Sequence, residues 1–214
     1  MSFYGKEFLT FSSNAIDGSL PSELGLLTSI TELYLYKNQI TGPIPRELAQ
    51  LANITILALY DNKLTGTLPT EIIVLSTNLL ALNLENNTLK GTLPTEVGLL
   101  TNLSTLIVSY NNFTGTIPTE IGYLTILTDF EANSNDFNGT LPTEIGYLTV
   151  LTIFYVDENQ LTGALPSEIG HLTNVTEFYI GKNKFTGIIP SEIGLMSALS
   201  ELFEPKFIFL ECLC

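Results

Sequence analysis

The sequence predicts an α/β repeat solenoid in which short parallel strands alternate with short helical turns. An Asn-x-apolar-x-Gly-x-x-Pro motif recurs eight times along the 214 residues, at steps of 24 residues and once of 25. Apolar residues stand five and three positions before each Asn, and eight of the ten prolines share one column of the repeat. A unit this short cannot bury its apolar side alone, so the copies must stack.

Each repeat opens with a predicted strand of about five residues. Its paired apolar positions, with a freely varying residue between them, have the period of two that is typical of a strand with one buried face. The stacked strands are therefore expected to form a parallel sheet along the concave side, about 4.8 Å apart. The apolar pairs are Leu9 and Phe11, Leu33 and Leu35, Leu57 and Leu59, Leu82 and Leu84, Leu106 and Val108, Phe130 and Ala132, Phe154 and Val156, and Phe178 and Ile180.

An asparagine follows each strand where the backbone must turn. Its amide can satisfy backbone groups of its own turn and of the neighbouring turn, so stacked copies would form an asparagine ladder. Glycine four residues later supplies backbone freedom at the next bend. The asparagines are Asn14, Asn38, Asn62, Asn87, Asn111, Asn135, Asn159 and Asn183.

The proline that ends the motif predicts a short helical turn on the convex side. We expect proline at the first helical position, where a missing N–H is harmless, and the glutamate two residues later at the positive end of the turn. The extra residue of the 25-residue step falls in the segment Ile72 to Leu79, where Ile73 replaces the usual glycine. That turn is expected to be irregular.

The segment from Leu100 to Leu124, LTNLSTLIVSYNNFTGTIPTEIGYL, resembles a plant-type leucine-rich repeat (LRR), as found in the ectodomains of LRR receptor-like proteins and kinases. The resemblance covers about residues 3 to 198. It implies a right-handed superhelix, a second small sheet around the TGxIP segment, and contacts with a ligand or co-receptor through the concave and lateral faces. Members of this type usually carry an N-terminal cap with paired cysteines and a tryptophan, which this chain lacks. We therefore expect a fragment of a longer protein.

Two parts of the chain are predicted. Residues 1–198 form the solenoid, and residues 199–214 form an irregular tail or makeshift cap, because Pro205 and Phe207 break the repeat pattern there. Cys212 and Cys214 are the only cysteines, so no disulfide framework is expected, and two ligands cannot complete a zinc site.

Composition excludes several classes of partner. The net charge of −14 opposes binding to nucleic acid, and no apolar run is long enough to insert into a membrane. No motif for a cofactor or for nucleophilic catalysis is present. His171 occupies a variable position of a helical turn, so we interpret it as a surface residue of that turn and not as a metal ligand or an acid–base catalyst.

The candidate site is the concave face, which the variable strand residues should line. Tyrosine gives a large contact area with a polar tip, and carboxylates in the middle repeats would attract a basic segment of a partner. We therefore expect a protein or peptide ligand. The predicted contact residues are Tyr34, Tyr36, Tyr60, Glu85, Asp129, Glu131, Asn133, Tyr155, Asp157, Glu177 and Tyr179.

Two other uses of the acidic residues stay open at this point. Asp129 and Glu131 stand two apart on one strand, roughly 6 to 7 Å, which is close to the spacing of an inverting glycosidase pair. An open face has no pocket walls to raise the pKa of one carboxyl, so catalysis is disfavoured. A Ca²⁺ site could combine Asp129 and Glu131 with Asp157 and Glu158.

Compartment is predicted from two conflicting signals. Six Asn-x-Ser/Thr sequons suit a protein that faces the secretory lumen, whereas the start MSFYGKEFLTF does not have the apolar run of a signal peptide. We expect an extracellular or cell-surface position as part of a longer protein, with a cytoplasmic one as the alternative. The sequon asparagines are Asn53, Asn86, Asn102, Asn112, Asn138 and Asn174.

These observations together predict a non-catalytic recognition module, a piece of a cell-surface receptor-like protein in signalling. The alternative is a free-standing LRR binder, such as a secreted inhibitor of a hydrolase.

Overall fold

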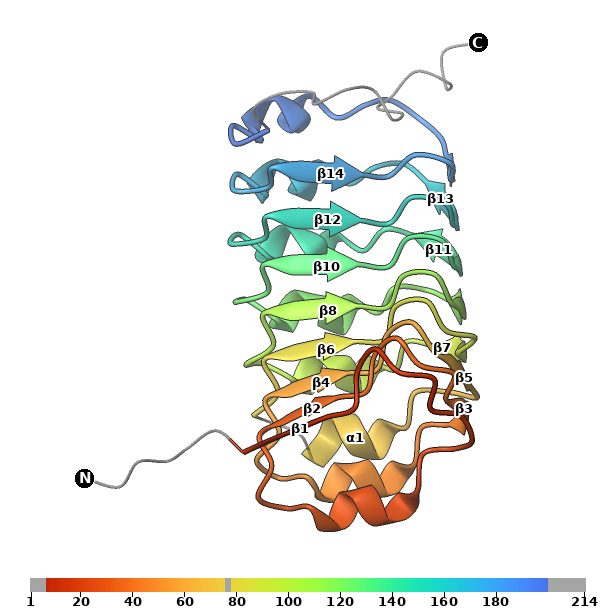
Figure 1. Ribbon diagram of the computed structural model, residues 1–214. Coiled ribbons are helices and arrows are strands. Elements are labelled where there is room, and N and C mark those ends of the chain that lie inside the picture. The colour runs from red at the N-terminus through yellow and green to blue at the C-terminus, as the bar shows by residue number, and fades with distance from the viewer. Residues whose placement is uncertain (1–6, 76–77, 200–214) are drawn as a thin grey trace, which may run out of the picture.

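The computed structural model describes residues 7–75 and 78–199, which form a stack of repeats with the main sheet on one side and short helices on the other (Figure 1). In these residues the main sheet has eight parallel strands in the order β1-β2-β4-β6-β8-β10-β12-β14. Each strand is separated from the next by one repeat. The strands are β1 (Phe8–Thr10), β2 (Glu32–Tyr34), β4 (Ile56–Ala58), β6 (Ala81–Asn83), β8 (Thr105–Ile107), β10 (Asp129–Glu131), β12 (Ile153–Tyr155) and β14 (Glu177–Tyr179).

The strands are shorter than the predicted five residues. Each has three residues, and three positions after each strand the residue before the ladder asparagine takes a positive φ, as Tyr110 does at 53° and Ser134 at 53°. Pairing between repeats nevertheless continues past the strand: the Tyr110 N–H donates to the carbonyl of Asn133 at 3.0 Å. The register places Phe130 beside Leu106 and Phe154, so apolar columns run unbroken through the stack.

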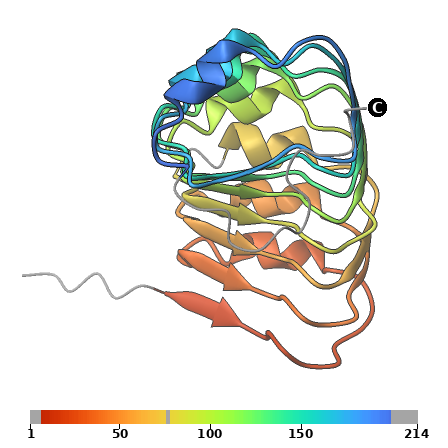
Figure 2. The ribbon, with the colours of Figure 1, turned by 90° about the horizontal axis from the view of Figure 1, so that it is seen from above.

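A second set of short parallel strands forms around the TGxIP segments, as the LRR resemblance implied. One group has the order β15-β13-β11-β9-β7, and β3 pairs with β5 separately. Figure 2 shows this side of the solenoid joining the main sheet to the helical side. The strands are β3 (Thr41–Pro43), β5 (Lys63–Thr65), β7 (Lys90–Thr92), β9 (Asn112–Gly115), β11 (Asp136–Thr140), β13 (Gln160–Gly163) and β15 (Lys184–Phe185).

The convex side carries one helical turn per repeat. Proline lies one residue earlier than predicted, at the N-cap, where Pro118 has φ −69° and ψ 143° and its carbonyl accepts from the Ile121 N–H. Proline still suits this position because its fixed φ favours the extended entry into the turn. The glutamate lies in the first turn, as expected. The 3₁₀ helices are η1 (Ser22–Leu26), η2 (Arg46–Gln50), η3 (Thr95–Leu99), η4 (Thr119–Tyr123), η5 (Thr143–Tyr147), η6 (Ser167–His171) and η7 (Ser191–Leu195).

The repeat with the extra residue differs, as predicted. Its turn is an α-helix, α1 (Thr70–Leu75), instead of a 3₁₀ helix, and Ile73 is fully buried. In most other repeats this position holds a glycine, and alanine occupies it in η2, at Ala49. Interior glycines are pressed against the next repeat: a Cβ on Gly122 would lie 2.7 Å from the carbonyl oxygen of Glu144. Ile73 lies instead in an α-helical turn, and its side chain belongs to the hydrophobic core.

The asparagine ladder is confirmed. The amide of Asn111 donates to the carbonyls of Leu84, Val108 and Ser109, and its oxygen accepts from the Leu89 N–H. One side chain thus joins two repeats and satisfies buried backbone groups that no strand pairs with.

The core fills the space between the main sheet and the convex helices. Leucine dominates the N-terminal repeats, whereas phenylalanine rings pack on one another in the C-terminal ones: Phe130 and Phe154 are tilted with centroids 5.8 Å apart, and Phe154 and Phe178 stack at 5.3 Å. The predicted tail at 199–214 lies outside the described residues, except for Leu199. Its boundary stays a prediction.

Candidate ligand-binding face

The concave face is built by the residues that alternate with the buried strand positions. On β10, Phe130 is fully buried while Asp129 and Glu131 are partly exposed, and the same alternation holds on β12 and β8. Because neighbouring strands are in register, variable residues from different repeats lie side by side in columns. The tyrosines and acidic residues of the prediction therefore meet on one surface.

A tyrosine cluster occupies the N-terminal part of this face. The rings of Tyr36 and Tyr60 stack with centroids 4.4 Å apart and planes 5° apart, and Tyr34 meets Tyr36 edge-on at 6.3 Å. The Tyr34 hydroxyl donates to Oε2 of Glu32 at 3.0 Å. Burial, and next the hydrogen bond to the Glu32 carboxylate, raise the pKa of Tyr34, so its hydroxyl stays a protonated donor. The cluster offers ring faces and edges that are already ordered.

Acidic residues occupy the middle of the face. Burial, and next the negative charges of Glu85, Asp129 and Glu177, raise the pKa of the half-buried Glu131 carboxyl to about 7. Burial and the charge of Asp61 likewise raise the pKa of Glu85. Near neutral pH the group at Glu131 is thus divided between its acid and carboxylate forms.

A second tyrosine pair lies toward the C-terminal end. Tyr155 and Tyr179 stack with centroids 4.6 Å apart, and the Tyr155 hydroxyl donates to Oε2 of Glu177. Burial and this hydrogen bond raise the pKa of Tyr155. Two ordered aromatic platforms therefore flank the acidic centre.

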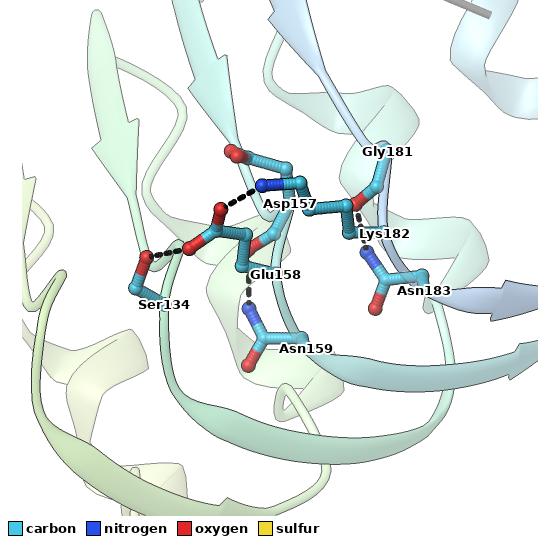
Figure 3. A network of polar contacts seen from close by, with 7 residues as sticks. All are labelled: Ser134, Asp157, Glu158, Asn159, Gly181, Lys182 and Asn183. Atoms are coloured by element: carbon cyan, nitrogen blue, oxygen red, sulfur yellow. Dashed lines mark hydrogen bonds and ion pairs between the residues drawn. The ribbon is translucent and has the colours of Figure 1, made fainter. Parts of the chain in front are cut away.

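A polar network closes the C-terminal rim of the face (Figure 3). The Glu158 carboxylate accepts from the Ser134 hydroxyl at 2.7 Å and from the Lys182 ammonium, which lie in the repeats on either side. The bonds from Lys182 and Ser134 lower the pKa of Glu158, whereas burial raises the pKa of its neighbour Asp157. The pairing makes Glu158 part of the rim's own structure.

The structure corrects two expectations about this face. Asn133 is buried, with 8% exposure, and its oxygen accepts from the Ser109 hydroxyl, so it supports the sheet instead of meeting solvent. The expectation that no carboxyl has a raised pKa was also wrong, because packed neighbours half-bury Glu131 on an open sheet.

The proposed Ca²⁺ ligands do not come together. In the described ranges, no three His, Cys, Asp or Glu side chains lie close enough to hold a metal ion. The Glu158 carboxylate is bonded to Ser134 and Lys182 instead.

Sequence reasoning missed two residues at the edge of the face. Asp61 influences the pKa of both Tyr60 and Glu85, and Tyr110 is a 52% exposed ring with φ of 53°. Both immediately precede a ladder asparagine. A comparison of the residues at this position in successive repeats could have identified them from the sequence.

The sequon asparagines lie away from the concave strands, and all six are exposed. Asn112 and Asn138 lie on β9 and β11 of the second sheet, and Asn86 occupies a turn with φ of 51°. His171 is an exposed residue at the end of η6, as expected for a variable surface position.

A groove of about 680 Å³ lies on the outer wall, lined by threonine and proline of successive repeats, including Thr92, Thr116 and Thr140. These residues belong to the part that every repeat reproduces. The variable residues of the concave face remain the candidate for specific recognition.

This combination of a concave parallel sheet, an asparagine ladder and convex 3₁₀ turns decides the fold. The chain is built of leucine-rich repeats. The Leucine Rich Repeat family model matches residues 29–51 and 102–124. Among curated proteins, none matches the chain by sequence.

Solved structures of LRR proteins are similar to the chain over most of its length. The LRR ectodomain of the plant membrane receptor kinase GASSHO1/SCHENGEN3 from Arabidopsis thaliana, solved with CASPARIAN STRIP INTEGRITY FACTOR 2, has a TM-score of 0.87 and 36% identity over 89% of this chain. The plant peptide hormone receptor RGFR1, solved with RGF2, has a TM-score of 0.88 and 33% identity over 90%. The Leptospira interrogans LRR protein LIC12759 has a TM-score of 0.72 and 38% identity over 86%.

The chain spans only part of these proteins: 23% of the GASSHO1/SCHENGEN3 chain, 31% of RGFR1 and 45% of LIC12759. Among residues 7–75 and 78–199, no helix has the length and apolar character needed to cross a membrane. The similarity is that of an LRR ectodomain whose relatives include receptors that bind peptide ligands.

Proposed function

We propose that this LRR solenoid is the recognition part of a cell-surface receptor-like protein in signalling, and that it binds a peptide or protein segment with a basic residue on its concave face. The plant receptors similar to it include a peptide hormone receptor, which supports a peptide ligand here. The chemistry of the concave face supports the basic residue.

The observation that carries this proposal is an acidic centre between two aromatic platforms. The first and third residues of each main-sheet strand, and the second residue after it, form three columns on the concave face. In the described residues these columns contain no Lys or Arg, so Glu85, Asp129 and Glu131 have no cation facing them from neighbouring strands. A ligand ammonium or guanidinium would relieve this repulsion, and stacked tyrosines can hold its flanking residues.

The spacing of the platforms sets the length of the ligand. Tyr60 follows β4 and Tyr155 lies on β12, four strand steps away, or about 19 Å at normal sheet spacing. An extended segment of about six residues spans that distance. We expect it to place its basic residue near Glu131 and its ring-binding residues at the two ends.

The raised pKa of Glu131 predicts how binding depends on pH. A cation favours the carboxylate form, so binding releases a proton when Glu131 is protonated beforehand. Affinity for a basic ligand should therefore increase from about pH 6 to about pH 8.

An array of short immobilised peptides that differ only in Lys and Arg content tests the proposal. Basic peptides should bind the wild-type chain, and the Glu131→Gln/Tyr155→Phe variant should bind them at least about tenfold more weakly. Asp136→Asn is the matched control, because Asp136 is exposed in the same repeat but lies on the second sheet. Unchanged binding by the double variant would refute this site.

The extracellular assignment has a separate test. If the protein is made in the secretory pathway, some of the six exposed sequon asparagines should carry glycans, and an endoglycosidase should increase its electrophoretic mobility. A native protein with no mobility shift would favour the cytoplasmic alternative.

A further inference from the structure

The edge of the solenoid where each helical turn leads into the next concave strand has a column that is usually asparagine. Asparagine here ties successive repeats together, because its amide donates to a backbone carbonyl of the preceding repeat. The observed bonds are Asn53 to Thr28 at 3.0 Å, Asn78 to Ala52 at 3.0 Å and Asn174 to Thr149 at 2.7 Å.

The column is asparagine before four of the seven main-sheet strands from β2 to β14 and serine, Ser29, before β2, whereas two adjacent repeats have aliphatic residues in it. Ile126 and Val150 occupy the column before β10 and β12, and their apolar side chains are 46% and 40% exposed. An aliphatic side chain in this position gives up a hydrogen bond between repeats and leaves apolar surface in water, which disfavours it in an isolated molecule.

The same two repeats carry an exposed tyrosine three residues earlier. Tyr123 ends η4 and Tyr147 ends η5, with 60% and 59% exposure, and the two helices pack side by side. We call Tyr123, Ile126, Tyr147 and Val150 the apolar edge. Figure 1 shows the turns before β10 and β12 stacked on the same side of the molecule.

The apolar edge is also uncharged. Neither turn, YLTILT from Tyr123 nor YLTVLT from Tyr147, contains an ionisable group other than its tyrosine, although the chain has a net charge of −14. Two copies of so acidic a chain repel each other over most of their surfaces. At this edge they can approach without bringing carboxylates together.

We propose that the apolar edge is the contact through which two copies of this chain associate about a twofold axis. An axis between the two repeats would place Tyr123 against Tyr147 of the second copy and Ile126 against its Val150. The contact is self-complementary because both repeats carry the same pair of residue types, as a twofold interface requires. In the repeats on either side, asparagine occupies the column of Ile126 and Val150, at Asn102 and Asn174, whereas the tyrosine column continues with the exposed Leu99 and His171.

The size of the patch sets the strength of the association. Two tyrosines about 60% exposed and two partly exposed aliphatic side chains offer roughly 400 Å² of apolar surface per copy. A stable interface buries about 800 Å² per partner, so this contact belongs to the weak, reversible class. We expect dissociation in the micromolar to millimolar range. A membrane or a larger assembly that concentrates the chain would favour the pair.

Sedimentation velocity of the whole chain, from about 1 to about 500 µM under reducing conditions, tests the proposal. The sedimentation coefficient of the wild type should increase with concentration. Tyr123→Asp/Tyr147→Asp should weaken association at least tenfold, because like charges would face each other across the axis. Tyr110→Asp is the control, since that ring is similarly exposed but lies on the opposite edge of the concave strands.

A charge-pair variant tests the twofold register. In Tyr123→Lys/Tyr147→Asp, each introduced ammonium would face an introduced carboxylate of the other copy, so association should return where the double Asp variant lost it. A wild type that stays monomeric throughout overturns the proposal. Association that the double Asp variant leaves unchanged, or that the charge-pair variant does not recover, overturns it too.

Discussion

The asparagine ladder and the concave sheet face run side by side through the same repeats but follow opposite rules. In the interior repeats the ladder keeps one residue type, buried to between 3% and 8% exposure, with nearly the same hydrogen bonds each time. The concave positions change from tyrosine to carboxylate to alanine over the same distance. The difference teaches that the ladder and outer wall fix the backbone, which leaves the adjacent surface free to vary without loss of the fold.

Removal of a ladder amide should have the largest effect. Asn135→Ala leaves the buried carbonyls of Val108 and Ala132 and the Phe113 N–H without a partner, so the free energy of unfolding should fall by about 3 to 5 kcal/mol. Asn14→Ala, in the exposed first repeat, should cost about 1 kcal/mol or less. Urea unfolding of both variants measures the contrast, and equal losses would contradict the ladder's role.

A methyl group added to the outer wall should have the next largest effect. A Cβ on Gly146 would lie 2.6 Å from the carbonyl oxygen of Glu168, so Gly146→Ala must push two repeats apart and should cost about 2 to 3 kcal/mol. Gly194→Ala is the control, because nothing lies within 4 Å of its added Cβ. Thermal melting should separate the two variants. If they melt alike, the close packing of the wall is not limiting.

A change in the concave face should stabilise the protein. The pKa of Glu131 is about 7 in the folded chain and near 4.5 when unfolded, so the unfolded chain loses its proton first and stability falls as pH rises between these values. Glu131→Gln removes this cost. Above about pH 7 the free energy of unfolding of this variant should be about 1 kcal/mol higher than that of the wild type, after allowance for solvent screening. The advantage should disappear near pH 4, and an advantage that persists there would have another cause.

The smallest effect is expected at the rim. Lys182→Ala breaks the exposed pair with Glu158, and such pairs contribute about 0.5 kcal/mol or less. Added salt should screen the ion pair and lower the free energy of unfolding of the wild type toward that of the variant. A loss of several kcal/mol would mean that the rim network, and not the ladder alone, holds the C-terminal repeats together.

Much of the fold could be predicted from the repeat itself. The columns of Asn, Gly and Pro identified the ladder, the bend and the helical turn, and the extra residue before Leu79 predicted the altered turn that became α1. Strand length and the position of proline were missed by small margins. Both depend on local dihedral angles, such as the extended ψ of 143° at Pro118, which residue type alone does not specify.

The candidate face was predicted less completely. Its tyrosines and carboxylates were identified by column, but Asn133 was expected in solvent and Glu131 was expected to ionise normally. Asn133 is buried because Ser109, 24 positions away, lies beside it, and the pKa of Glu131 depends on burial and on acidic residues of its own repeat and of two others.

The sequence by itself determined the repeat length, the inward and outward positions and the residues available on each face, because period and turn chemistry act within one repeat. Only the tertiary structure decided which of those residues touch. It stacked Tyr36 on Tyr60 and Tyr155 on Tyr179, and it set Tyr123 and Ile126 beside Tyr147 and Val150. The reason is that neighbours in a solenoid lie a full repeat apart in the chain, and stacking brings them together.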